Sequence, residues 1–235
     1  MLPKLNQPTF ELTLPSNNQT IEYRPFLVKE EKILLTAKEA GTHEDILRAI
    51  RTIINNCVIT PGFDVDKLPT FDFEYIFINL RSKSVSNMID VIVTDSTDEA
   101  DYTISINLDD VEIKRTEGHD TKFQLTKDVG IIMKYPTPVL SEILRREETI
   151  VDLTYKLVEA CIDKVYTEEE VYNWADESEE EREEFLGSIS VETYEKLKDF
   201  FLTMPKLYYE TTYTNSKGDE KTVKFQSLDD FFIWD

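Results

Sequence analysis

Pro25 divides residues 21–35 into two halves that cannot share one regular structure. Before it, Ile21 and Tyr23 alternate with polar residues, which predicts a β-strand with one apolar face. After it, apolar residues recur at near-helical spacing as far as Gly41, and proline suits the first turn of a helix. The chain therefore passes directly from a strand into a helix, and we call residues 21–35 the joint.

The segments on either side of the joint predict a β-hairpin and a small helical cluster. An alternating apolar run from Phe10, a turn rich in Pro, Ser and Asn, and the strand before Pro25 form the hairpin. Thr42 begins a sequence that resembles a capping box, and the apolar stripe after it predicts a second helix as far as Cys57. An aromatic stripe beyond Pro69 predicts a third helix, packed against the first two.

From Val85 onward the apolar period changes from that of a helix to two. This change predicts a meander of short strands through the middle of the chain. Residues 139–166 are then predicted to be one helix, and the Glu-rich residues 167–184 a solvated helix or helix pair with one apolar edge. A helix over residues 191–203 and a hairpin over residues 208–225 follow, before an apolar tail.

Together these patterns predict an α+β fold. It consists of an N-terminal β-hairpin with a helical cluster, a central antiparallel β-meander, and C-terminal helices closed by a β-hairpin. The predicted divisions are residues 1–84, 85–138 and an acidic helical region at 139–235. The alternative is that all three form one domain, and the sequence leaves this choice open.

The balance of charge restricts the partners that we expect. The chain has 26 basic and 47 acidic side chains, a formal net charge of −21, and this field repels phosphate backbones and anionic lipid surfaces. No run approaches the roughly 20 apolar residues that span a bilayer, and the start lacks the apolar segment of a secretory signal. We therefore expect a cytosolic protein that binds neither nucleic acid nor membrane. Cys57 and Cys161 lie in helical apolar patterns, which predicts that both are buried free thiols. Free thiols fit a reducing compartment.

No motif for catalysis, metal binding or nucleotide binding stands out. The six glycines are too dispersed for a phosphate-binding loop, and neither histidine has a neighbour at metal-ligand spacing. The acidic turn at 95–101 and the pairs Asp64/Asp66 and Asp109/Asp110 would need an enclosing pocket to do chemistry. We therefore expect no catalytic residue, no metal, no cofactor and no small-molecule substrate.

Two groups of residues remain as candidates for contact with a protein partner. The joint contributes Arg24, Phe26, Glu30, Glu31 and Lys32. They form either one contact surface or the solvent face of a corner, and charge reversal at Arg24 or Glu31 is expected to weaken binding without loss of stability. The apolar tail contributes Phe231, Phe232 and Trp234. The tail either folds back onto the core or inserts into a groove of a partner, and the Glu-rich segment is either a solvated face or a dock for a basic partner.

Several segments together resemble the baseplate hub family of T-even-type contractile-tailed bacteriophages. They are P-K-L-N-x-P-T-F-E-L-T-L-P at 3–15 and residues 23–32, 53–57, 63–68, 80–85 and 106–110, within roughly the first 135 residues. The resemblance implies a non-enzymatic late protein of the phage, chaperone-like, that helps to assemble the hub by contacting other baseplate hub proteins in the host-cell cytoplasm. The alternative is a permanent structural subunit of the baseplate hub in the virion. A less favoured third hypothesis is an enzyme with an acidic or metal-dependent site.

One hairpin departs from the family pattern. Many members carry Cys-x-x-Cys-like residues in the segment that corresponds to 93–102, which suggests a zinc-binding knuckle, whereas the turn here has no thiol. Zinc is therefore not expected. The hairpin is expected to hold by cross-strand pairing instead, with Ile89, Val91 and Val93 opposite Tyr102, Ile104 and Ile106.

Overall fold

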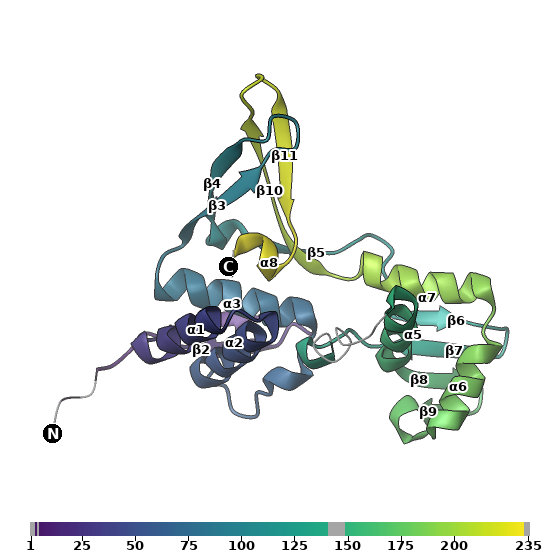
Figure 1. The fold of residues 1–235 in the computed structure, drawn as a ribbon. Helices are drawn as coiled ribbons and strands as arrows, with labels where there is room; N and C mark the ends of the chain where they lie inside the picture. The colour runs from purple at the N-terminus through teal and green to yellow at the C-terminus, as the bar shows by residue number, and fades with distance from the viewer. Residues whose placement is uncertain (1–2, 4, 141–148, 233–235) are drawn as a thin grey trace. The chain divides into compact units, whose positions relative to one another are not determined.

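The computed structural model describes residues 3, 5–140 and 149–232, and it has the α+β architecture that the sequence predicts (Figure 1). The chain forms two compact units, each with its own hydrophobic core. Unit 1 contains residues 1–114 and 206–235, and unit 2 contains residues 115–205. These boundaries differ from the predicted ones because β5 (Glu112–Lys114) pairs with β10 (Lys206–Thr214), which returns the C-terminal segment to the N-terminal unit.

The N-terminal part of unit 1 is the predicted hairpin and three helices. The hairpin is β1 (Phe10–Thr13) with β2 (Thr20–Tyr23), and the helices are α1 (Val28–Ala40), α2 (His43–Cys57) and α3 (Thr70–Ser84), with the short helix η1 (Val65–Lys67) between the last two. Gly41, at a φ of 74°, ends α1 in the left-handed conformation that glycine tolerates best. The Thr42 side chain accepts a hydrogen bond from the backbone N–H of Asp45 at 3.1 Å and so begins α2.

Two long hairpins complete unit 1 (Figure 1). They are β3 (Met88–Thr94) with β4 (Asp101–Asn107), and β10 with β11 (Glu220–Phe225). The first hairpin has the predicted cross-strand pairs, namely Ile89 with Ile106, Val91 with Ile104, and Val93 with Tyr102. After it come the short helix η2 (Leu108–Asp110) and β5, which makes the second hairpin a three-stranded sheet.

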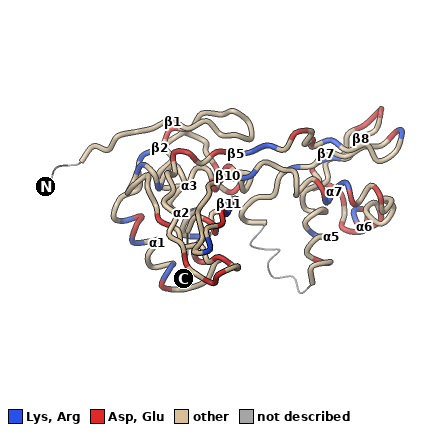
Figure 2. The backbone as a smooth tube through the Cα atoms, turned by 90° about the horizontal axis from the view of Figure 1, so that it is seen from above, with Lys and Arg blue, Asp and Glu red and all other residues tan. Residues whose placement is uncertain are grey.

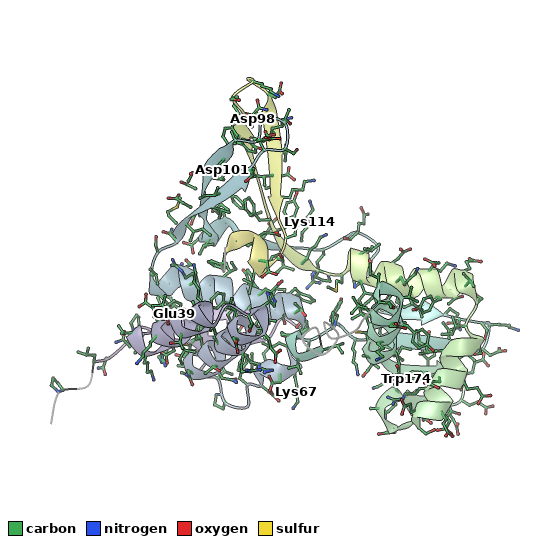
Figure 3. All side chains as sticks on the ribbon, in the orientation of Figure 1. Glu39, Lys67, Asp98, Asp101, Lys114 and Trp174 are labelled. Atoms are coloured by element: carbon green, nitrogen blue, oxygen red, sulfur yellow. The ribbon has the colours of Figure 1, made fainter. Side chains whose placement is uncertain are left out.

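The tips of the two hairpins are joined by the acidic turn at 95–101. The Asp95 carboxylate accepts hydrogen bonds from Tyr213 Oη at 3.1 Å and Asn215 Nδ2 at 3.3 Å. Asp98, labelled in Figure 3, accepts hydrogen bonds from the backbone N–H of Ser216 at 3.0 Å and from its hydroxyl at 2.6 Å. The turn therefore connects two distant parts of the chain.

Unit 2 is a four-stranded antiparallel sheet with helices. Its strands lie in the order β6-β7-β8-β9, and they are β6 (Lys122–Gln124), β7 (Val129–Met133), β8 (Ile162–Thr167) and β9 (Val171–Asn173). Its helices are α5 (Ile150–Cys161), the short η3 (Trp174–Asp176), α6 (Glu179–Ser188) and α7 (Val191–Thr203). Among the side chains of its core are Ile131, Val158, Leu197 and Phe200.

Three sequence-based expectations differ from this arrangement. The strands predicted as one meander belong to three sheets, because a period of two identifies a strand but not its partner. The predicted helix over 139–166 ends at Cys161, and β8 begins at the next residue to pair with β7. Its residues 141–148 lie outside the described residues. The predicted helix over 167–184 begins only after Ser178, since Val171 and Tyr172 pair with β8 instead.

Candidate interaction surface

Arg24 connects three parts of unit 1 at the joint. Its guanidinium donates hydrogen bonds from Nη1 to the backbone carbonyl of Pro25 at 2.9 Å, and from Nη2 to Glu30 Oε1 at 3.0 Å and to the carbonyl of Asn56 at 2.9 Å. Asn56 lies in the last turn of α2, where a cation is favourable. The backbone N–H of Arg24 also donates to the carbonyl of Cys57 at 3.0 Å. Arg24 therefore fixes the end of β2 against α2 and the start of α1.

Glu30 and Phe26 are buried at the same corner. The Glu30 side chain is fully buried, and its second oxygen accepts a hydrogen bond from the backbone N–H of Leu27 at 2.9 Å, at the start of α1. Burial alone would raise the pKa of Glu30, but the hydrogen bonds from Arg24 and Leu27 bring it below its ordinary value. Phe26 is 5% exposed, and its backbone N–H donates to Ser84 Oγ at 2.8 Å.

The joint thus separates into buried and exposed residues. Phe26 and Glu30 lie in the interior, and the side chain of Arg24 is only 17% exposed, so these three residues hold the fold together. The expectation that charge reversal at Arg24 leaves stability unchanged is corrected by this geometry, because the reversal would leave Glu30 without its buried partner. Glu31 and Lys32 are exposed on α1.

Lys32 lines an open groove between α1 and α2, which we call the α1–α2 groove. Its volume is about 430 Å³. Its floor includes Ile33, Ala37 and Ala49, and three cations line it: Lys29, Lys32 and Arg48. Arg48 is paired with Glu44 at 2.8 Å, so the groove combines an apolar floor with a partly neutralised basic rim.

The C-terminal tail and the other side of α1 line a second groove of about 450 Å³, which we call the α1–β3 groove. Its lining residues are Leu34, Leu35, Lys38, Arg81, Met88, Ile89, Asp90, Val91, Phe231 and Phe232. Burial lowers the pKa of Arg81 while the nearby Glu31 carboxylate opposes this shift, so Glu31 also lies close to this groove. Leu35 is 56% exposed and Met88 is 48% exposed, which leaves apolar surface open to solvent at the groove.

The tail folds back onto unit 1 as far as it is described. Phe231, in the short helix α8 (Leu228–Phe231), is 2% exposed and packs against Phe225 with ring centroids 5.5 Å apart. Phe232 meets Phe77 edge to face at 5.7 Å. Phe231 and Phe232 therefore follow the first of the two alternatives, in which the tail folds back onto the core. Trp234 lies outside the described residues.

The acidic pairs considered for catalysis are held by local contacts. Asp64 begins the short helix η1 and pairs with Lys67 at 3.1 Å, while Asp66 pairs with Arg51 at 3.5 Å. Asp109 accepts hydrogen bonds from Ser82 at 2.6 Å and Lys83 at 2.9 Å, and these bonds lower its pKa. In the part of the chain that the structure describes, no three His, Cys, Asp or Glu side chains are grouped as a metal site requires.

The grooves include residues that the sequence did not single out. The helical period correctly places Arg48 on the face of α2 opposite the apolar stripe. The period does not indicate that α1 packs beside this face of α2. Likewise Met88 and Arg81 meet α1 only through the folding of β3 and α3. No helix among the described residues is long and apolar enough to span a membrane.

The fold and this surface define an α+β protein of two units, with apolar grooves on either side of an exposed helix. The sequence pattern of the family described as T4 bacteriophage base plate protein matches residues 7–233. The chain therefore belongs to this family of phage baseplate proteins. No curated protein and no solved structure matches it.

Proposed function

We propose that this baseplate protein is a non-enzymatic, chaperone-like assembly factor that binds other proteins of the baseplate hub through α1 and its two grooves. The observation that carries the proposal is the exposure of Leu35 and Met88 beside a groove that Lys38 and Arg81 also line. Open apolar surface with charged residues at its edge is typical of sites where proteins bind each other.

The composition of the chain supports a soluble shielding role. A net charge of −21 opposes self-association and steers basic partners toward the protein, and this steering weakens as salt rises. The cations that line the two grooves are therefore a local exception, which favours a partner segment with apolar residues and a few carboxylates. The host-cell cytoplasm during phage assembly is where such a factor acts.

Co-expression with the hub proteins of the same phage tests this proposal. We expect the parent chain to be recovered in a complex at low and moderate salt, with less complex for Lys32→Glu and Leu35→Asp. Burial of a leucine contributes about 1.5–3 kcal/mol, so Leu35→Asp should weaken binding at least about tenfold.

Two matched variants serve as controls for these changes. Lys67→Glu reverses an exposed lysine of unit 1 outside both grooves, and Leu202→Asp alters a leucine of α7 that is 72% exposed. Both should bind as the parent does. Recovery of the parent only as a free monomer, or equal losses in test and control variants, would contradict the proposal.

The second candidate function is that of a permanent structural subunit of the hub, since the description of the family names the base plate itself. Mass spectrometry of purified virions against infected-cell lysate separates the two candidates. An assembly factor should be present in lysate and depleted from virions, whereas a subunit should be present in virions at a fixed copy number.

Enzymatic activity is the third hypothesis, and we propose that it is absent. The contacts of Asp64 with Lys67 and of Asp109 with Ser82 and Lys83 lower the pKa of each carboxyl group, so neither suits the role of a general acid.

A further inference from the structure

Unit 2 contains a cavity of about 280 Å³, and none of the residues that line it belongs to the α1–α2 groove or the α1–β3 groove. Its apolar walls come from Val129, Val165, Tyr172, Trp174 and Phe185. Its polar lining comes from Thr167, Glu177, Glu181 and Arg182. The residues belong to the sheet, η3 and α6, so the cavity lies where the helix covers the sheet.

Two N–H groups on the residues that line this cavity have no acceptor. Trp174, labelled in Figure 3, is 4% exposed, and its Nε1 has no hydrogen-bond partner in the described part of the chain. Nε of Arg182 is also buried without a hydrogen-bond partner in the described chain, and the Glu159 carboxylate lies 3.9 Å from it, beyond hydrogen-bonding distance. Buried polar groups are nearly always hydrogen-bonded, so each of these two donors needs an acceptor that the described chain does not supply.

The charge around the cavity restricts what this ligand is. Residues 167–184 contain ten acidic side chains and one basic one, Arg182. Acidic residues follow one another along α6 and the turn before β9 (Figure 2). A field of this sign repels a free anion and attracts a cationic chain. The field therefore favours a ligand whose hydrogen-bond acceptors are neutral carbonyl groups over one with phosphates or carboxylates.

The sheet beside the cavity ends in a strand that can accept an extended chain. β9 is the outer strand of the order β6-β7-β8-β9, and within the described residues it pairs only with β8. Its residues are exposed, with Val171 64% and Tyr172 40% accessible. Exposed edge strands bind extended segments through their backbone, while alternate side chains of the segment enter pockets.

We propose that this cavity binds an extended, basic segment of a partner protein. One large apolar side chain of the segment fills the cavity, and backbone carbonyls of the segment accept hydrogen bonds from Trp174 Nε1 and Arg182 Nε. Flanking lysines or arginines lie against Glu177 and the acidic residues of α6. This site shares no residue with the α1–α2 groove or the α1–β3 groove. The proposal therefore does not depend on whether those grooves bind hub proteins.

A synthetic peptide tests the proposal with the full-length protein. The probe is the blocked, dye-labelled peptide KRVLVRK, which has a leucine anchor, β-forming valines and basic flanks, and its binding is followed by fluorescence anisotropy. We expect saturable binding that weakens as salt rises. The anchorless peptide KRVGVRK and the acidic peptide EEVLVEE should bind at least about tenfold more weakly.

Variants of the protein locate the binding. Trp174→Phe removes the indole N–H but keeps an aromatic ring, and should weaken binding about three- to tenfold, the effect of one hydrogen bond. Glu177→Lys should weaken it further, whereas Glu220→Lys, which makes the same change of net charge on β11 of unit 1, should have a much smaller effect. In the Trp234→Phe background Trp174 is the remaining tryptophan of the chain, and its emission should change on binding.

Several results would overturn the proposal. They are the absence of saturable binding, equal binding of KRVLVRK and EEVLVEE, or equal losses in Glu177→Lys and Glu220→Lys. Lys32→Glu and Leu35→Asp should leave peptide binding unchanged, so loss of hub binding and loss of peptide binding report on different surfaces. Circular dichroism of each variant verifies that it is folded.

Discussion

The two units use their buried polar groups in opposite ways. In unit 1, Arg24 and Glu30 meet at 3.0 Å in the interior, and their hydrogen bonds connect β2, α1 and α2. In unit 2, Trp174 and Arg182 each hold a buried N–H group without an acceptor, beneath an acidic surface. Satisfied groups stabilise a fold, whereas unsatisfied ones destabilise it until a ligand pairs with them. The comparison therefore separates buried groups that connect elements of the fold from buried N–H groups that we propose pair with a ligand.

The largest effect should follow from breaking the buried pair of unit 1. Arg24→Glu places a second carboxylate beside Glu30 and removes the hydrogen bond to the carbonyl of Asn56. Removing one partner of a buried ion pair costs about 3–5 kcal/mol, so unit 1 should lose at least that much stability. Amide hydrogen exchange of β1 and β2 measures the loss.

Glu31→Lys is the matched control, because it reverses a charge on the exposed side of the same helix turn. Its stability should stay within about 0.5 kcal/mol of the parent. Equal losses in Arg24→Glu and Glu31→Lys would contradict a structural role that is particular to Arg24.

A pH-dependent effect should follow from Glu74 on α3. Burial raises the pKa of Glu74 from 4.5 to about 8, and the nearby Asp229 and Asp230 carboxylates add to the shift. Its side chain accepts a hydrogen bond from the backbone N–H of Leu228 at 3.4 Å, at the start of α8. Between these two pH values the unfolded chain loses the proton that the folded chain keeps, so stability falls as pH rises from 4.5 through 8.

Glu74→Gln removes this titration while keeping an oxygen for Leu228. Because one pKa unit is worth about 1.4 kcal/mol, the shift from 4.5 to about 8 should make the variant more stable than the parent at high pH by up to about 5 kcal/mol. The difference should vanish below pH 4.5, where the parent carboxyl is protonated in both states. Urea unfolding across this range measures it, and a constant difference at every pH would contradict the assignment.

A smaller effect should mark unit 2 alone. A Cβ at Gly130 of β7 would lie 2.3 Å from the ring of Tyr166 on β8, which donates a hydrogen bond to Gln124 at 3.2 Å. Gly130→Ala should therefore displace this ring and cost about 1–2 kcal/mol. Hydrogen exchange should quicken in β7 and β8 and stay unchanged in β3 and β4. Gly187→Ala is the control, since no atom lies within 4 Å of a Cβ there.

The sequence predicted local elements better than their partners. The boundaries of α7 and the register of β3 with β4 followed from apolar period and turn residues, which are local. The pairing of β5 with β10 joins residues about 90 positions apart, so no local pattern indicates it. For the same reason the apolar run after Cys161 was predicted as helix, although β-branched Ile162 and Val165 pair with β7.

The candidate residues show the same limit. Arg24, Phe26, Glu30, Glu31 and Lys32 are one cluster in sequence, yet only the fold separates the buried from the exposed members. Sequence located the acidic segment at 168–184, but Trp174 could not be placed beside a cavity without the sheet that forms it.

One pair of matched substitutions tests the difference between the units most directly. Arg24→Met and Arg182→Met make the same chemical change in unit 1 and in unit 2, and hydrogen exchange gives the free energy of opening of each unit. Arg24→Met should cost unit 1 about 3–5 kcal/mol. Arg182→Met removes a donor without an acceptor and a long, partly exposed ion pair with Glu159 at 3.9 Å, so it should change unit 2 by less than about 1 kcal/mol. Equal costs, or a larger cost in unit 2, would contradict the account.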